Sequence, residues 1–269
     1  MTRNQLIEQI RKKRSYLCVG LDTDIDKIPK HLHSSADPVL EFNKAIIDAT
    51  REYCVAYKIN TAFYEAMGVN GWDIMAKTVA YIGADHFKIA DAKRGDIGNT
   101  SEQYAKAFFG LMPFDAITIA PYMGEDSVKP FLKFPNKWGI VLGLTSNIGA
   151  KDFELQKMRG EQEYLYEKVL KTVAAWGNPG NLMFVIGATQ SDEFLNIRKL
   201  APDHFYLVPG VGAQGGSLAE ISRKAMNKDV GLLVNASRAI IYASSGKDFA
   251  EAAGKAALDY QQEMASFLQ

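Results

Sequence analysis

Short apolar segments alternate with amphipathic segments along most of the chain. Most of the apolar segments are rich in Val and Ile, and several end in Gly, Asp, Lys or Pro, as buried parallel strands do. They cover residues 16–21, 55–59, 87–92, 116–120, 139–144, 182–186, 205–208 and 230–234. The pattern therefore predicts eight buried strands.

The segments between these strands carry apolar residues at helical spacing. The first helix is predicted to begin at Asp37-Pro38, with Asp37 as N-cap and proline at the first helical position. Its apolar face consists of Val39, Phe42, Ile46 and Ala49. Residues 100–103 resemble a capping box that opens another helix. Further helices are predicted for residues 164–176, 218–226 and 248–268.

Eight strands that alternate with helices predict an α/β fold, a single (β/α)8 TIM barrel. An open doubly wound sheet is the alternative that the pattern leaves open. The chain has 269 residues, of which 47% are hydrophobic, so it can bury a large core. We therefore expect residues 1–269 to form one barrel domain.

The charge balance narrows the classes of partner. Lys plus Arg and Asp plus Glu both number 31, and the net charge is zero, so nothing favours long-range attraction to nucleic acid or to an anionic membrane. The first residues lack an apolar signal core, and no run approaches 18 apolar residues. We expect a cytoplasmic protein.

The third predicted strand ends in a cluster of charges, Asp91-x-Lys93-x-x-Asp96. Because side chains alternate along a strand, Asp91 and Lys93 are predicted to point the same way, with Asp96 beyond a turn at Gly95. In a barrel of parallel strands, the carboxyl ends of the strands form the active site. A purely structural network of salt bridges is the alternative.

The carboxyl ends of the other predicted strands carry Asp22, Lys58, Asn60, Pro121, Thr145, Ser146, Asn147, Thr189, Gln190, Asn235, Ser237 and Arg238. The loop 209–216, Pro-Gly-Val-Gly-Ala-Gln-Gly-Gly, contains the G-x-G-x-x-G pattern of dinucleotide sites. The following strand, however, ends without the acidic residue that would bind a ribose hydroxyl. With Arg238 after the eighth strand, the loop fits the phosphate site of a barrel better.

These motifs together resemble the orotidine 5′-monophosphate decarboxylase family, and the resemblance covers nearly the whole chain. The matching stretches are residues 18–22, 58–65, 91–97, 144–147, 209–216 and 237–238. The chain length and the Thr-Ser-Asn sequence after the fifth strand look like the longer bacterial branch. The resemblance implies loss of CO₂ from C6 of orotidine monophosphate, the last step of de novo UMP biosynthesis, without a cofactor or metal.

The resemblance also implies roles for single residues. The catalytic set would be Lys58, Asp91, Lys93 and Asp96. Lys93 would stabilise the carbanion at C6 and then protonate it, while Asp91 would lie near the departing carboxylate. Lys58 and Asp96 would keep the network neutral. The substrate would be bound by Asp22, Ile97, Thr100, Ser146, Pro209, Gln214, Ser237 and Arg238.

The family is homodimeric, which implies that Asp96, Ile97 and Thr100 serve the site of the partner subunit. Thr100 is also compatible with a role as helix N-cap.

Two other functions share parts of the pattern. Metal-dependent sugar-phosphate enzymes of the same superfamily use Asp-x-Lys-x-x-Asp together with a carboxylate after the second strand, where this chain has Lys58. A catalytically silent barrel that binds phosphate and acts as an interaction protein would need a broken set of catalytic residues. In this sequence the set is intact.

Overall fold

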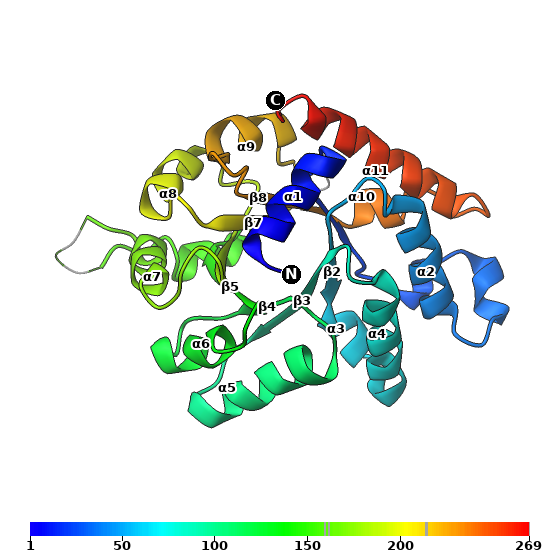
Figure 1. Ribbon diagram of the computed structural model, residues 1–269, viewed down its shortest axis with the longest axis horizontal. Helices are drawn as coiled ribbons and strands as arrows, with labels where there is room; N and C mark the ends of the chain where they lie inside the picture. Colours follow the sequence, from blue (N-terminus) through cyan, green and yellow to red (C-terminus); the bar gives the residue numbers. More distant parts are fainter. Residues whose placement is uncertain (159, 161, 213–214, 269) are drawn as a thin grey trace.

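The computed structural model describes residues 1–158, 160, 162–212 and 215–268. Eight parallel strands form a closed barrel in the order β1 to β8, and the helices surround it (Figure 1). The strands are β1 Leu17–Gly20, β2 Ala56–Asn60, β3 Phe87–Arg94, β4 Ala116–Ile119, β5 Trp138–Leu144, β6 Leu182–Ile186, β7 Phe205–Pro209 and β8 Leu232–Ala236. Since β1 pairs with both β2 and β8, the predicted barrel is confirmed and the open sheet is excluded.

Each predicted strand lies within two residues of its predicted limits. The difference reaches two residues at the end of β3 and at both limits of β8, which begins at Leu232 rather than at Val230. Val230 and Gly231 adopt left-handed backbone conformations, with φ of 69° and 65°, in a turn that Asn227 and Val230 close. The regular strand begins after these two residues, at Leu232.

The helices fill the connections between the strands and also precede β1. They are α1 Arg3–Lys13, α2 Pro38–Thr50, α3 Thr61–Glu65, α4 Gly68–Ile82, α5 Gly98–Ala105, α6 Glu125–Leu132, α7 Leu165–Ala174, α8 Phe194–Leu200, α9 Leu218–Ala225, α10 Arg238–Ile241 and α11 Phe249–Ala265. The start of α2 at Pro38 agrees with the prediction, although the Asp37 side chain makes no capping hydrogen bond to the described residues. The capping box predicted for residues 100–103 is wrong, because α5 begins at Gly98 with Ile97 as its N-cap.

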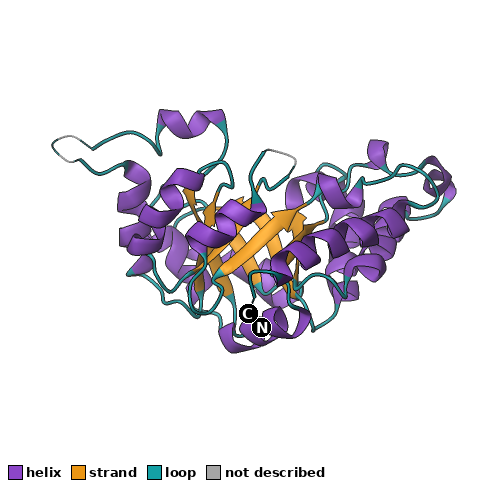
Figure 2. Cartoon of the chain, turned by 90° about the horizontal axis from the view of Figure 1, so that it is seen from above, coloured by secondary structure: helices purple, strands orange, loops and turns teal. Residues whose placement is uncertain are grey.

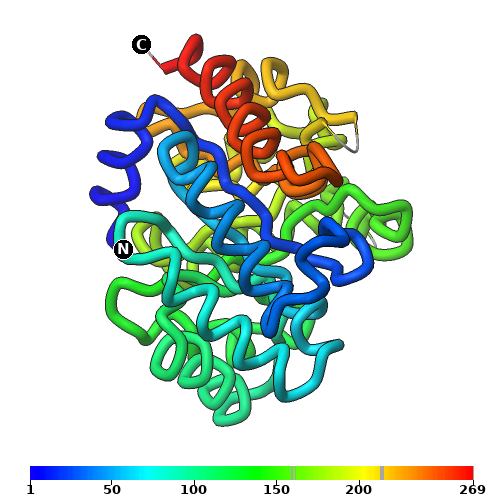
Figure 3. Tube along the Cα trace, turned by 90° about the vertical axis from the view of Figure 1, so that its right-hand side faces the viewer, coloured from blue at the N-terminus to red at the C-terminus, as the bar shows by residue number. Residues whose placement is uncertain are grey.

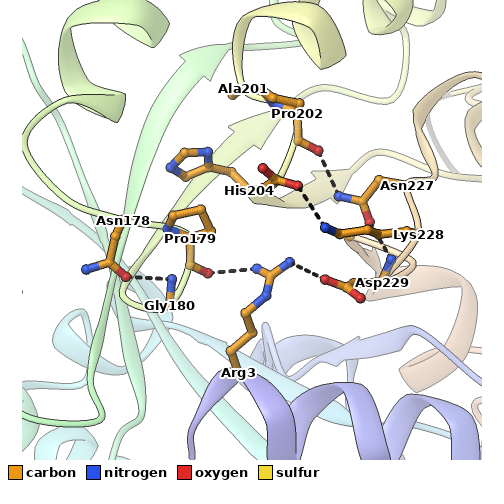
Figure 4. Close-up of polar contacts among 12 residues, drawn as sticks. Arg3, Asn178, Pro179, Gly180, Ala201, Pro202, His204, Asn227, Lys228 and Asp229 are labelled. Atoms are coloured by element: carbon orange, nitrogen blue, oxygen red, sulfur yellow. Dashed lines mark hydrogen bonds and ion pairs between the residues drawn. The ribbon is translucent and has the colours of Figure 1, made fainter.

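Helix α1 lies across the end of the barrel where the strands begin (Figure 1). Its apolar side is narrow, with Leu6 and Ile10 buried. Arg3 fastens it to two loops, donating to the Pro179 carbonyl at 2.7 Å and to Asp229 Oδ2 at 3.0 Å (Figure 4). The segment after β5 extends from the opposite end of the barrel (Figure 2). The two ends of the barrel are therefore covered by different parts of the chain.

The last helix of the outer layer packs against the helix that follows β1. Helix α11 packs against α2 (Figure 3), and Phe249 stacks on Phe42 with ring centroids 5.1 Å apart. The fully buried side chains of Phe87 and Trp138 pack edge to face, with ring centroids 5.9 Å apart. Among the described residues, no helix has the length and apolar content that a membrane span requires.

Candidate active site

A cavity of about 340 Å³ lies at the carboxyl ends of the strands. Its walls come from β1, β2, β3, β5, β6, β7, β8 and the loops that follow them, as expected for a barrel of this type. The lining residues are Asp22, Lys58, Asn60, Asp91, Lys93, Leu142, Thr145, Ser146, Asn147, Val185, Leu207, Pro209, Gly210, Val211, Asn235, Ser237 and Arg238. Asp22 and Lys58 therefore meet Asp91 and Lys93, which are distant from them in sequence, in one cavity.

The four charges form a chain of ion pairs. Lys58 is 3% exposed, and its Nζ lies 3.1 Å from Asp22 Oδ1 and 3.0 Å from Asp91 Oδ2. The other oxygen of Asp91, Oδ1, lies 2.7 Å from Lys93 Nζ. Each buried charge is thus paired, which is the condition under which burial of charge is tolerated.

The pairing fixes the charge states of the two most buried members. Burial by itself lowers the pKa of Lys58, but the carboxylates of Asp22 and Asp91 outweigh it and raise that pKa above its usual range. Burial likewise acts to raise the pKa of Asp91, and the ammonium groups of Lys58 and Lys93 reverse the effect and lower it. Near neutral pH the cavity therefore contains fixed charges of both signs.

β3 ends at Arg94, immediately before Gly95, and it is irregular at Lys93, where its register with β4 shifts. Lys93 has φ of 46°, the left-handed conformation that residues other than glycine rarely adopt. Its N–H donates to Thr118 Oγ1 at 2.9 Å, and the Thr118 hydroxyl donates to Asp91 Oδ1 at 3.0 Å. Thr118 is a contributor that the sequence analysis missed; the available signal was a single hydroxyl within the apolar strand Ala-Ile-Thr-Ile.

Asp96, Ile97 and Thr100 lie at the start of α5 and do not line the cavity of their own chain in the described structure. Asp96 Oδ1 accepts from the N–H of Ile97 at 2.7 Å, and its backbone N–H and carbonyl both bond to Ser101 Oγ. Ile97 is 54% exposed. Thr100 lies within the helix, so the alternative that it serves as N-cap is wrong.

Pro209, Ser237 and Arg238 meet where β7 and β8 end, beside β1. The contact with β1 is close, because a Cβ on Gly20 would lie 1.8 Å from Ser237 Oγ. Asn235, a second residue that the site prediction omitted, donates from Nδ2 to Ser237 Oγ at 3.3 Å. Its buried Oδ1 has no hydrogen-bond partner within the described chain. Gln214, predicted for the same region, lies outside the described residues.

Ser146 occupies the wall that β5 and β6 form. A Cβ on Gly187 would lie 2.6 Å from the Ser146 nitrogen, so the two turns touch. The neighbouring Thr145 is fixed by Glu154, which accepts from its N–H at 2.6 Å and from its hydroxyl at 2.8 Å. Gln190, which does not line the cavity, donates to the Thr145 carbonyl at 2.8 Å. Neither Glu154 nor this role of Gln190 was visible in the sequence, because the contacts depend on how the loops fold back.

The described residues contain no group of three or more His, Cys, Asp or Glu side chains arranged to hold a metal ion. In the cavity, the position between Asp22 and Asp91 is filled by the Lys58 ammonium.

Comparison with known proteins agrees with this geometry. The model of the orotidine 5′-phosphate decarboxylase / HUMPS family matches residues 15–253. A curated protein of Christiangramia forsetii, named orotidine 5′-phosphate decarboxylase, is 60% identical over 272 residues, covering 100% of this chain and 99% of its own length. A protein of the same name from Parabacteroides distasonis is also 60% identical, with 100% and 96% covered.

Solved structures give the same result. The Leishmania donovani OMP decarboxylase superposes with a TM-score of 0.86 at 34% identity, covering 100% of this chain and 99% of that one. The Methanocaldococcus jannaschii orotidine 5′-monophosphate decarboxylase, solved with the inhibitor BMP, gives a TM-score of 0.65 at 25% identity, with 90% and 96% covered. From its sequence and its fold alike, this chain belongs to the orotidine 5′-phosphate decarboxylase / HUMPS family.

Proposed function

We propose that this protein decarboxylates orotidine 5′-monophosphate to uridine 5′-monophosphate, the last step of de novo UMP biosynthesis, and that residues 1–269 act as one catalytic unit. One observation carries the proposal: Asp91 lies between the ammonium groups of Lys58 and Lys93 at the floor of the cavity. A metal-dependent relative needs a carboxylate where Lys58 stands, and the Lys58 ammonium would repel a cation there. The names of the relatives at 54–60% identity support the same choice.

The charges suit a reaction that produces a carbanion. Loss of CO₂ from C6 leaves an electron pair in the plane of the pyrimidine ring, where no π-system can delocalise it. The Lys93 ammonium can stabilise that charge and then donate its proton to C6, while Asp91 lies beside the departing carboxylate. Because these groups are already oriented by Lys58 and Thr118, they need not reorganise during the reaction. No cofactor or metal takes part in this scheme.

The rest of the cavity is assigned to the other parts of the substrate. Asp22 binds a ribose hydroxyl and Ser146 reads the pyrimidine. The phosphate is held by Pro209, Gln214, Ser237 and Arg238. In support, the described members of this set all line the same cavity as Lys93. A guanidinium such as that of Arg238 can bind phosphate through two parallel hydrogen bonds.

We propose that the active unit is a homodimer in which Asp96, Ile97 and Thr100 complete the partner's site. These residues lie outside the cavity of their own chain, at the exposed start of α5. The loop after the neighbouring strand β4 also exposes Tyr122, by 89%, and Met123, by 51%. Large apolar side chains that are exposed on neighbouring loops are compatible with a protein interface. The proposal includes no role for nucleic acid or for a membrane. It locates the enzyme in the cytoplasm.

The test is the loss of absorbance from orotidine 5′-monophosphate with the purified protein, with and without a chelator. We expect equal turnover in both. If the chelator abolishes activity and Mg²⁺ restores it, the protein is a metal-dependent relative. If the folded protein has no activity under either condition, it is a silent phosphate-binding barrel.

A further inference from the structure

We infer that Arg94, held by Glu65, is a positioning residue that fixes Lys93 in its active conformation, an inference that rests on the role proposed for Lys93. Arg94 does not line the cavity in the described structure, so it acts through its neighbour and not on the substrate. Neither residue belongs to the catalytic or binding set proposed above.

The guanidinium of Arg94 joins three elements at the end of β3. It forms an ion pair with Glu65 of α3, the helix that follows the strand of Lys58. Its Nη1 donates to the Ala92 carbonyl at 2.9 Å. The group also lies over two aromatic rings that follow β3, with its centre 5.4 Å from the Tyr104 ring and 5.6 Å from the Phe108 ring. The side chain is 20% exposed, so it is a packed group and not a free surface charge.

One of these contacts encloses Lys93. Ala92 and Arg94 flank it in sequence, so the hydrogen bond from Arg94 Nη1 to the Ala92 carbonyl closes a ring around it. Lys93 is the residue with φ of 46°, a conformation that persists only when its surroundings hold it. On the other side, the backbone of Arg94 is fixed to β4, because its carbonyl accepts from the N–H of Ala120 at 2.9 Å.

The conformation of this one residue decides where the Lys93 ammonium lies. The Lys93 side chain is 50% exposed, and its ion pair with Asp91 is its one salt bridge within the described residues. Little packing therefore holds the side chain, and its direction is set mainly by the backbone from which it starts. If the hydrogen bond from Arg94 to the Ala92 carbonyl is lost, the backbone at Lys93 can relax. The Lys93 ammonium then moves away from its position beside Asp91.

Arginine suits this position better than lysine. The contacts with Glu65 and with the Ala92 carbonyl use two different nitrogens, Nη2 and Nη1, of one rigid planar group. A lysine ammonium is a single point at the end of a flexible chain and cannot reproduce both contacts and the aromatic stacking together.

The test compares Arg94→Met with a matched variant, Arg51→Met. Arg51 also pairs with a carboxylate, Asp48 at 3.3 Å, and lies over a ring, Tyr81 at 6.0 Å, but it precedes β2 at the opposite end of the barrel. Both variants are assayed where circular dichroism shows them to be folded. A displacement of about 1 Å costs roughly 100-fold in rate. We therefore expect Arg94→Met to lose about that factor in kcat with little change in KM, and Arg51→Met to keep its kcat.

A second readout separates positioning from stability. Arg94→Ala should regain kcat when guanidinium chloride is added at a non-denaturing concentration, compared with sodium chloride at equal ionic strength. Arg94→Lys, without added guanidinium, should keep only part of the wild-type kcat. Glu65→Gln should also lose kcat, but by a smaller factor than Arg94→Met. If Arg94→Met does not fold, Glu65→Gln is the variant that tests the inference.

Unchanged kcat in folded Arg94→Met, or a loss that guanidinium does not restore in Arg94→Ala, would overturn the inference. The proposed function fails independently of it: a wild type that does not turn over orotidine 5′-monophosphate removes the function, whereas an active wild type with an equally active Arg94→Met removes only the role of Arg94.

Discussion

At the scale of single residues, the site consists of charges that hold one another in place. Lys58 touches two carboxylates, and Asp91 touches two ammonium groups and the Thr118 hydroxyl. Removing one buried charge leaves the opposite charge beside it unpaired, which typically lowers the free energy of unfolding by several kcal/mol. Lys93, half-exposed at the end of the chain of ion pairs, can be removed with the smallest effect on the fold.

Lys93→Ala should therefore retain the native fold and lose nearly all turnover. The general-acid contribution alone is worth about 10²–10⁴-fold, and the loss of charge stabilisation adds to it. Circular dichroism and kcat with orotidine 5′-monophosphate check the two parts. A folded variant within about tenfold of wild type, a difference of less than ~1.4 kcal/mol, would remove Lys93 from its proposed role.

Arg238→Ala should weaken capture of the phosphate without removing the reacting groups. Activity with the full substrate is expected to fall mainly in kcat/KM. With a nucleoside that lacks the phosphate, wild type and variant should be alike, because the missing contact has no partner in that substrate. An equal loss with both substrates would show that Arg238 acts elsewhere.

Several of these residues could be predicted from the sequence, and several could not. Asp91 and Lys93 were predicted to meet because they end one strand, and they do. The turn predicted at Gly95 follows the end of β3 at Arg94, whereas the left-handed conformation of Lys93, which tertiary contacts hold, could not be predicted. Thr118 and Glu154 depend on neighbours that only the closed barrel provides.

At the scale of elements, the end of the barrel where the strands begin is built differently from the cavity. Arg3 and the loops before β6, β7 and β8 lie around His204 (Figure 4). Arg198 donates from Nη1 to the His204 carbonyl at 2.7 Å. Burial, with the charges of Arg3 and Arg198, lowers the pKa of His204 to about 4. Burial and the charge of Lys13 lower the pKa of His86, at the start of β3, to about 4 as well.

These two histidines should make the fold less stable in acid. An unfolded histidine takes up a proton as the pH falls through about 6.5, whereas the folded one resists until about pH 4, so stability is lost across this interval. Between pH 7 and pH 5, each histidine should lower the free energy of unfolding by roughly 2 kcal/mol. Urea unfolding at both values should show it, and His204→Phe should remove about half of the difference. The control is His33→Gln at an exposed position; an undiminished difference in His204→Phe would contradict the assignment.

The helices show where periodicity suffices. The apolar faces of α2 and α11 are long enough to be predicted: α2 begins at Pro38 as expected, and α11, predicted over residues 248–268, spans Phe249–Ala265. Helix α1 escaped prediction because charged residues surround its two buried ones, and its place depends on Arg3 meeting loops far along the chain. The start of α5 was misplaced because its N-cap is Ile97, a residue type that gives no capping signal.

At the scale of the whole molecule, the cavity draws on strands from both halves of the chain and yet leaves three predicted site residues outside it. Asp96, Ile97 and Thr100 can act on a substrate only if a second copy presents its cavity to them. In a two-fold dimer the exchange is reciprocal, so each site would borrow from the other chain.

Mixed subunits test this arrangement. Asp96→Ala and Lys93→Ala should each be nearly inactive alone. Their heterodimer contains one site with neither change, formed by Lys93 of the first chain and Asp96 of the second. Random exchange places about half of the dimers in this form, so about a quarter of wild-type activity should return. No recovery after proven exchange would show that each chain completes its own site.

The pairing of β1 with β8, in which Leu17 lies beside Val234, has a consequence for the order of events during synthesis. The strand made first keeps an unpaired edge until the strand made last leaves the ribosome, and such contacts, distant in sequence, form slowly. Asp22 is translated early and Arg238 late, so a nascent chain holds the group proposed to bind ribose long before the one proposed to bind phosphate. The ability to bind the whole nucleotide should therefore arise at the same moment as the closed sheet, and a ribosome-stalled chain that ends before β8 should have neither.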